Sequence, residues 1–201
     1  MRKSVRGTEE QADLFEQEAR LPSGFSYQAE LIEPEAERAL LAQLTSLPFQ
    51  EFTFHGFHAK RRVVWFGWRY DFNGGGLRRT EPPLPSFLVP VRDQAAAYAE
   101  IKSADLQQVL VTEYRPGAAI GWHKDRSDFG VVVGVSLLSP CRFRLRRKQE
   151  ARWERVHLTI APRSIYVLRG ESRSQWEHSI PAVSTLRYSI TFRNVLNAAR
   201  S

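Results

Sequence analysis

The second half of the chain is a series of short strand-like segments separated by turns, and this pattern limits the possible folds more than any other feature. Candidate strands cover residues 106–114, 131–138, 142–147, 153–160, 164–169, 176–180 and 187–195. The segments 142–147 and 187–195 alternate apolar and polar residues, which is typical of half-buried strands. Gly and Pro separate the segments, with no helical pattern between them. This arrangement indicates a β-sandwich or a jelly-roll barrel.

The first half contains three candidate helices. They cover residues 8–20, 34–46 and 92–102. Pro34 suits the first turn of the second helix. One face of that helix would carry the apolar side chains of Ala36, Ala39, Leu40 and Leu44. The Gly- and Pro-rich segment 73–92 is predicted to be a long loop of the kind that covers a site. We therefore expect a mostly β (α+β) fold with N-terminal helices.

Composition restricts the class of protein. A length of 201 residues suits one domain, and an apolar content of 42% is enough for a core. The longest apolar runs are too short to span a bilayer, and the N-terminus lacks the apolar segment of a secretory signal. The single cysteine, Cys141, excludes an internal disulfide and fits a reducing compartment. We expect a cytoplasmic protein with no membrane association, monomeric and without an obligate protein partner.

The formal charge is +7, and the basic residues are clustered. The clusters lie at residues 60–62, 78–79 and 142–148. Aromatic residues follow the first cluster, at Trp65, Trp68, Tyr70 and Phe72. Cations interleaved with aromatic rings suit a surface that grips a nucleic-acid backbone and stacks on its bases. A generally basic, solvated surface is the alternative reading.

The segment IGWHKDRSDFG places His123 and Asp125 two residues apart. In an extended segment both side chains leave the same side of the backbone, so both can reach one ion. The histidines downstream are His157 and His178. His157 lies within a strand pattern, where a core or surface role is expected, so His178 is the better third ligand. Two His and one carboxylate are the ligand set of Fe(II) oxygenases, although H-x-D alone also suits a polar turn.

Arg187 and Arg193 lie on one face of the last candidate strand, together with Ser189 and Thr191. The opposite face carries Tyr188, Ile190 and Phe192. The guanidinium fork of arginine suits a carboxylate of a dicarboxylic cosubstrate. In a barrel the polar face can point inward and form part of a site, whereas on an open surface it would be solvated.

The combination of H-x-D, a later His and R-x5-R resembles the AlkB family of Fe(II)/2-oxoglutarate dioxygenases. The matching segments are TEYRPGAAIGWHKD, GVSLL, RGESRSQWEHSIP and RYSITFR. Upstream, KRRVVWFGWRYDF resembles the nucleotide-recognition lid of that family. The resemblance covers roughly residues 50–195 and implies a double-stranded β-helix (jelly-roll) core. It divides the single domain 1–201 into an N-terminal helical extension (1–48), the lid (49–92) and the dioxygenase core (93–201).

The same resemblance implies the roles of the core residues. His123, Asp125 and His178 would be the catalytic Fe(II) ligands. Arg187 would pair with the distal carboxylate of 2-oxoglutarate, and Tyr114 would hydrogen-bond nearby. Arg193 would lie near the iron-side carboxylate and hold Asp125 ionised, and Trp176 would form a wall of the iron site. Thr112 and Ser189 stand where the family often has Asn, and both can still hydrogen-bond to the cosubstrate.

Substrate recognition is assigned by the resemblance to the lid and to the segment after Asp125. The residues expected to contact the base or its strand are Arg61, Trp65, Trp68, Tyr70, Phe72, Ser127 and Asp128. Ser127 stands where the family usually has an acidic residue that reads the damaged base, and Asp128 follows it. An ordinary hydrophobic cluster is the alternative role of the aromatic residues. These departures affect base preference rather than iron binding.

The activity implied is repair of alkylated bases in DNA or RNA by oxidative demethylation, using Fe(II), 2-oxoglutarate and O2 and releasing formaldehyde and succinate. A base alkylated on a ring nitrogen is cationic, which favours stacking on Trp or Tyr. Two alternatives stay open. The same chemistry can act on tRNA or a protein side chain, or the chain can be a nucleic-acid-binding module without catalysis.

Overall fold

The computed structural model describes residues 21–54, 57–71, 76–79 and 83–196. Its largest element is an antiparallel seven-stranded sheet. The strands follow in the order β1 (Phe25–Gln28), β11 (Ser164–Leu168), β8 (Phe129–Leu137), β13 (Arg187–Val195), β6 (Gln108–Tyr114), β3 (Phe57–Phe66) and β2 (Gln50–Phe54). A four-stranded sheet faces it, in the order β10 (Arg152–Ile160), β9 (Cys141–Gln149), β12 (Glu177–Ile180) and β7 (Ile120–His123). The predicted jelly-roll core is confirmed, and every strand expected after residue 105 forms.

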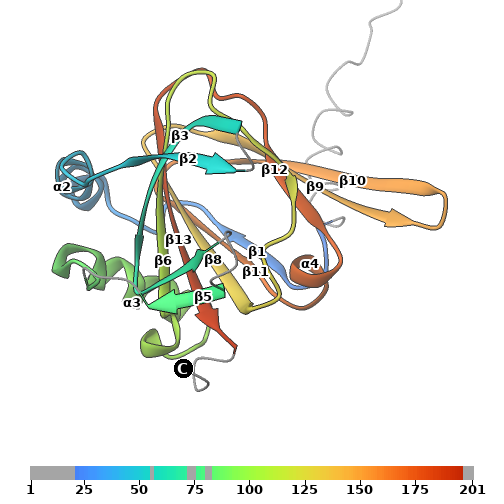
Figure 1. The fold of residues 1–201 in the computed structure, drawn as a ribbon, viewed down its shortest axis with the longest axis horizontal. Helices are drawn as coiled ribbons and strands as arrows, with labels where there is room; N and C mark the ends of the chain where they lie inside the picture. Colours follow the sequence, from blue (N-terminus) through green and yellow to red (C-terminus); the bar gives the residue numbers. More distant parts are fainter. Residues whose placement is uncertain (1–20, 55–56, 72–75, 80–82, 197–201) are drawn as a thin grey trace, which may run out of the picture.

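The alternation of side chains along the strands creates two separate cores. In β13, Tyr188, Ile190 and Phe192 pack into the core between the large sheet and the helices. Phe143 and Leu145 of β9 belong to a second core, between the two sheets. Helices thus cover one face of the large sheet and the small sheet covers the other (Figure 1). The polar positions of β13 therefore point into the space between the sheets.

The helices on the large sheet are α2 (Pro34–Leu44) and α3 (Val89–Tyr98), and α3 is flanked by the 3-10 turns η1 (Ser86–Leu88) and η2 (Ser103–Asp105). The prediction of α2 is confirmed, but its buried face is Leu40 and Leu44, while Ala36 and Ala39 are exposed. The larger leucine side chains determine which face is buried, because they remove more apolar surface from water. A short helix, α4 (Gly170–Ser174), precedes β12. The helix expected at 8–20 lies outside the described residues.

The expected long loop at 73–92 is wrong in part. Gly76–Arg79 forms β5, which pairs with β4 (Trp68–Asp71), and the end of the segment forms η1 and the first turn of α3. α3 begins at Val89, three residues before the predicted start. Pro90 lies in the first turn of this helix, where the missing N–H of proline costs no hydrogen bond.

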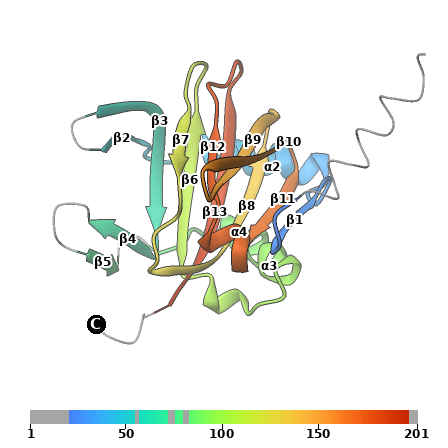
Figure 2. The same cartoon turned by 90° about the vertical axis from the view of Figure 1, so that its right-hand side faces the viewer.

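The N-terminal extension and the lid segment both contribute strands to the large sheet. β1 pairs with β11 at one edge, and β2 and β3 extend the sheet beyond β6 at the other. The hairpin β4–β5 leaves the large sheet at Gly67 (on the left in Figure 2). Gly67 has φ +79, and a Cβ there would lie 2.0 Å from the carbonyl oxygen of Gln107, so this sharp departure requires glycine. No helix in the described ranges is long and apolar enough to cross a membrane.

Candidate active site

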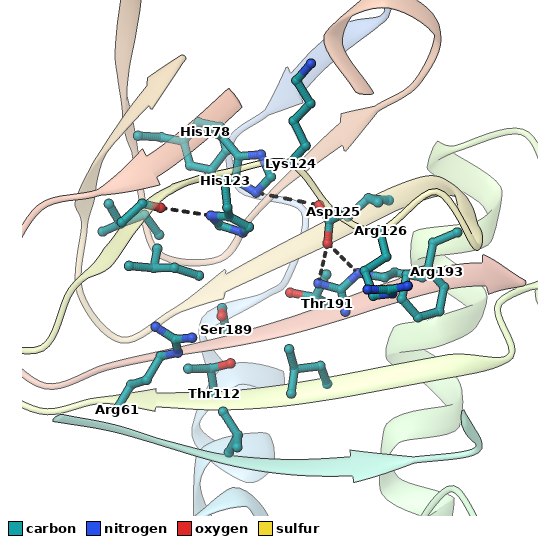
Figure 3. Close-up of a pocket in the computed structure, with 18 of the residues that line it drawn as sticks. Arg61, Thr112, His123, Lys124, Asp125, Arg126, His178, Ser189, Thr191 and Arg193 are labelled. Atoms are coloured by element: carbon teal, nitrogen blue, oxygen red, sulfur yellow. Dashed lines mark hydrogen bonds and ion pairs between the residues drawn. The ribbon is translucent and has the colours of Figure 1, made fainter. Parts of the chain in front are cut away.

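A cavity of about 570 Å³ lies between the two sheets. Its lining includes the predicted ligands His123, Asp125 and His178 and the predicted cosubstrate residues Tyr114, Thr112, Ser189 and Arg193. In Figure 3 the two histidines and Asp125 lie together, and Thr112 and Ser189 lie across the cavity from them. A volume of this size is ordinary for a small-molecule site.

Three side chains meet where β7 ends beside β12. His123 and His178 are register partners on these strands, and their ring centroids are 4.2 Å apart. Asp125 follows β7, and its Oδ2 lies 3.6 Å from Nε2 of His178. The H-x-D spacing thus brings both residues to one end of the cavity, and the pairing of the strands adds His178. No group of three His, Cys, Asp or Glu side chains within the described ranges has the spacing of a formed metal site.

Arg193 determines which oxygen of Asp125 is available to a ligand. Its Nε and Nη2 both donate to Oδ1, each at 2.8 Å. The other oxygen, Oδ2, is buried and accepts no hydrogen bond in the described structure. Gln108 holds the guanidinium in turn, because its Oε1 accepts from Nη1 at 2.8 Å. Burial, the largest single influence, would raise the pKa of Asp125, but Arg193 together with His178, His123 and Arg173 outweighs it and keeps that pKa well below its usual range.

The two histidines present ring nitrogens to the same place. Burial, with a smaller contribution from His123, lowers the pKa of His178 to about 3, so His178 is uncharged at neutral pH. Nδ1 of His123 lies 2.9 Å from the carbonyl oxygen of Gly121. A carbonyl only accepts, so Nδ1 carries the proton and Nε2 keeps its lone pair, as in metal-bound histidines. Two imidazoles beside an orphaned carboxylate oxygen fit a divalent iron ion.

Arg187 is a buried cation with unused donors. It is 1% exposed, and its guanidinium lies over the ring of Tyr114 at 5.0 Å. Nη2 donates to Oγ of Ser136 at 3.2 Å, whereas Nε and Nη1 have no hydrogen-bond partner among the described residues. Unpaired N–H groups on a buried guanidinium are suited to a carboxylate ligand. Arg187 itself is not among the residues that line the cavity, so the fit to a dicarboxylic cosubstrate rests on its contact with Tyr114, which does line it.

The floor of the cavity comes from β6 and β13. Thr112 and Ser189 are register partners and both line the cavity, so the two substitutions for Asn place short hydroxyls side by side. Tyr166 of β11 also lines it, because Gly134 leaves room for its ring. A Cβ at Gly134 would lie 2.1 Å from Cζ of Tyr166. Burial raises the pKa of the Tyr166 hydroxyl, which stays protonated.

Only some of the predicted lid residues lie at the cavity. Arg61 and Trp65 line it, and the guanidinium of Arg69 lies 4.5 Å over the ring of Trp65. Trp68 instead lines a second cavity, of about 480 Å³, beside the hairpin and η2. The side chain of Tyr70 and all of Phe72 lie outside the described residues.

Three further predicted residues are placed away from the cavity lining. Ser127 is exposed, and Asp128 accepts from Nε of Arg126 at 3.0 Å, while Arg126 itself lines the cavity. Trp176 is buried in the core between the sheets, with the guanidinium of Arg147 at 4.9 Å from its ring. It supports the site from behind rather than forming its wall. His157 is exposed on β10, as its strand pattern indicated.

Two residues with roles at the site were not predicted. Gln108 orients Arg193, and Arg173 of α4 holds the turn after Asp125. Nη2 of Arg173 donates to the carbonyl oxygens of Phe129, at 2.8 Å, and Arg126. The R-G-E-S-R segment was a sequence signal for Arg173, but only the fold shows what its guanidinium contacts.

The fold and the site together define an iron-dependent oxygenase. The family model described as the 2OG-Fe(II) oxygenase superfamily matches residues 24–193, and the chain belongs to this superfamily. Its relatives support an AlkB-like member. The family uses Fe(II), 2-oxoglutarate and dioxygen.

Three curated relatives show the extent of the similarity. Uncharacterized protein L905 of Acanthamoeba polyphaga mimivirus is 27% identical over 87% of this chain and 86% of its own length. The alkylated DNA repair protein ALKBH8 homolog of Arabidopsis thaliana is 28% identical over 69% of this chain and 50% of its own. The mitochondrial alpha-ketoglutarate-dependent dioxygenase alkB homolog 7 of Bos taurus is 37% identical over 60% and 55%. The chain spans about half the length of the last two.

Solved structures agree with the fold. OsALKBH1 matches with a TM-score of 0.63 and 16% identity, over 87% of this chain and 99% of its own. A prolyl-4-hydroxylase from Pseudomonas putida matches with a TM-score of 0.59 and 14% identity, over 92% and 97%. At these identities the similarity concerns the fold alone.

The lowered pKa of His178 predicts how the stability of the metal-free protein depends on pH. The unfolded chain takes up a proton on this residue below about pH 6.5, and the folded protein does so only near pH 3. The contribution of His178 is therefore complete above pH 6.5 and is lost as the pH falls towards 3. We expect the free energy of unfolding, measured in urea with a chelator, to fall by roughly 2 kcal/mol from pH 7.5 to 5.

The same measurement on His178→Gln is expected to give a flatter pH dependence over this range, since Gln does not titrate. His157→Gln removes an exposed histidine and serves as the control that keeps the wild-type slope. Equal slopes in the wild type and His178→Gln would contradict the prediction.

Proposed function

We propose that the protein removes alkyl groups from DNA bases by iron- and 2-oxoglutarate-dependent oxidation. The observation that carries the proposal is the cavity itself, in which Asp125 and the histidines share one space with Trp65, Trp122 and Arg61. Aromatic rings and a cation beside an oxidation site suit a flipped nucleotide, with the rings against the base and the cation near a phosphate. The name of the Arabidopsis relative, an alkylated DNA repair protein, supports the same substrate class.

The oxidation itself would come from the bound cofactors: Fe(II), 2-oxoglutarate and dioxygen would supply a hydroxyl group to the alkyl carbon, with succinate and carbon dioxide as coproducts. The bond between that carbon and the base nitrogen would then break, which releases formaldehyde and the unmodified base. The residues of this chain position the reactants. His123, His178 and Oδ2 of Asp125 would hold the iron, and Arg193 keeps Asp125 ionised and turned towards it. Arg187 would bind the distal carboxylate of the cosubstrate.

Recognition of the base would depend on charge as well as shape. Alkylation of a ring nitrogen gives the base a positive charge, which an aromatic face such as that of Trp65 attracts. Burial lowers the pKa of Arg61, yet its guanidinium stays charged at neutral pH, as contact with a phosphate requires. The cavity lining thus combines an aromatic ring for the base with a cation for the phosphate backbone.

The test is a panel of single-stranded oligonucleotides, DNA and RNA, methylated on a ring nitrogen of adenine or cytosine. With iron and 2-oxoglutarate we expect formaldehyde, succinate and the unmodified base in equal amounts from DNA. Repair of the RNA strands alone would show that the substrate is RNA rather than DNA. Succinate without base repair would point to another substrate, such as a protein side chain. Iron binding without any turnover would indicate a nucleic-acid-binding module without catalysis.

The cytoplasmic location, the monomeric state and the absence of an obligate partner stay predictions.

A further inference from the structure

We propose that the outer face of the small sheet binds the single-stranded DNA that flanks the nucleotide in the cavity. This inference rests on the proposed function, since it takes DNA as the substrate. We call this surface the arginine face. It consists of Trp122 of β7, Arg144, Arg146 and Lys148 of β9, and Trp153 and Arg155 of β10. The proposed catalytic machinery uses none of the residues of β9 and β10.

Strand alternation produces this face. Phe143 and Leu145 point into the core between the sheets, so Arg144 and Arg146 between them point outward. Arg155 is the register partner of Arg146 on β10, and its side chain is exposed. β9 and β10 form a long hairpin that extends away from the rest of the barrel, to the right in Figure 1. The cations therefore stand in neighbouring rows on a surface that a polymer can reach.

The arginines lie over tryptophan rings. The guanidinium of Arg146 lies between two rings, 4.4 Å from that of Trp122 and 4.3 Å from that of Trp153. Arg144 lies 4.8 Å from Trp122. Nε of Arg146 donates to Glu177 at 2.6 Å, and Nε of Arg144 donates to Ser179 at 3.0 Å. These bonds are made through Nε, so the terminal nitrogens that form forked bonds to phosphate are not consumed by them.

The charge of the face exceeds what its own carboxylate can neutralise. Arg142, also on the outer side of β9, adds to Arg144, Arg146, Lys148 and Arg155, against the carboxylate of Glu177. Such an excess attracts a polyanion by releasing its counterions. Trp153 is 39% exposed, although apolar rings of this size are usually covered. An exposed ring among arginines can stack on an unpaired base, whereas the bases of a duplex have their faces covered.

The arginine face is continuous with the cavity. Trp122 lines the cavity and also contacts both Arg144 and Arg146, so one residue joins the two surfaces. β7 lies at one edge of the small sheet and β10 at the other. A strand with one nucleotide in the cavity can therefore cross β12 and β9 towards the tip of the hairpin. This geometry favours a flexible single strand over a rigid duplex.

The test compares two variants that lose the same charge. Arg144→Gln/Arg146→Gln removes two cations from the face, and Arg38→Gln/Lys102→Gln removes two exposed cations on the helix side. Binding of a fluorescent, unmodified single strand of about 16 nucleotides is measured by anisotropy between about 50 and 200 mM salt. We expect the first pair to raise Kd at least about tenfold and to reduce the salt slope by about 1.4, or 0.7 for each lost phosphate contact. The control pair should change Kd less than about twofold.

A third variant separates stacking from charge. Trp153→Leu keeps every cation, so we expect Kd to rise roughly fivefold with an unchanged salt slope. Equal losses in the two charge pairs, or an equal loss for a duplex of the same sequence, would overturn the inference. So would a poly-glutamate peptide that displaces the strand as well as DNA does, which would assign the face to an acidic protein partner. Thermal denaturation of each variant identifies any that fails to fold.

Failure of this inference can be distinguished from failure of the proposed function. Binding of unmodified DNA needs no turnover, so the arginine face can be supported even if no methylated base is repaired. Conversely, turnover of a methylated mononucleotide should be the same in Trp153→Leu and in the wild type, because Trp153 does not line the cavity and a mononucleotide does not reach β10. If the protein repairs bases but these substitutions leave its affinity for the strand unchanged, the proposed role of the arginine face is wrong and the proposed function stands.

Discussion

Asp125→Asn is expected to abolish turnover of 2-oxoglutarate while leaving the fold in place. The amide oxygen can still accept from Arg193 in the position of Oδ1. The amide nitrogen, however, would replace Oδ2, the oxygen that accepts no hydrogen bond in the described structure. An N–H donor there has no lone pair for a metal.

The measurement is thermal or urea unfolding with and without Fe(II) under anaerobic conditions, together with succinate release. In the wild type, iron at a hundred times its Kd should stabilise the protein by about 2.7 kcal/mol. Asp125→Asn should show none of this stabilisation. Asp105→Asn, at an exposed site in η2, is the matched control and should behave as the wild type. Iron-dependent stabilisation that persists in Asp125→Asn would show that this carboxylate is not a ligand.

Arg187→Met is expected to raise the KM for 2-oxoglutarate on the order of a hundredfold or more, because loss of one partner of a buried charge pair costs about 2–5 kcal/mol. The same substitution should destabilise the cofactor-free protein by less than about 1 kcal/mol, since the guanidinium is buried there without a carboxylate and Met is a close match in volume. The two effects together would identify Arg187 as a cosubstrate ligand rather than a structural residue.

Steady-state kinetics with varied 2-oxoglutarate and urea denaturation without cofactors are the two measurements. Arg187→Lys keeps the charge but loses the fork, so its KM should lie between those of the wild type and Arg187→Met. Strong destabilisation of the cofactor-free protein, with an unchanged KM, would instead show that Arg187 stabilises the fold through Tyr114 and Ser136.

Much of the β core could be predicted from the sequence because its strands alternate regularly. In β13 the polar positions face the cavity, as Ser189 and Arg193 show, while Ile190 lies in the opposite core. β1 could not be found in this way. It has only four residues, and its partner β11 lies far along the chain, so neither its pattern nor its neighbours indicate a strand.

Site residues could be predicted where their spacing in the sequence alone brings them together. They could not be predicted where tertiary packing determines which side chain reaches the cavity. His123 and Asp125 need only an extended segment to share one end of the cavity. Which tryptophan lines the cavity depends on tertiary packing, since Trp122 and Trp176 each lie within two residues of a predicted ligand. Trp122 lines the cavity, whereas Trp176 is buried in the core between the sheets. The partners of Arg173 are likewise backbone carbonyls, which no sequence pattern identifies.

The position of β1 at the edge of the large sheet has a consequence for the time course of synthesis. Phe25 pairs with Leu168, so β1 emerges from the ribosome 143 residues before its partner strand exists. At about 5–20 residues per second, this delay is roughly 7–29 s. During that interval β1 has no partner strand, although β3 can pair with β6 as soon as residues 108–114 have been made. The nascent chain therefore completes its large sheet only after β13 has been made, and until β11 exists β1 is an unpaired strand that can pair with other chains.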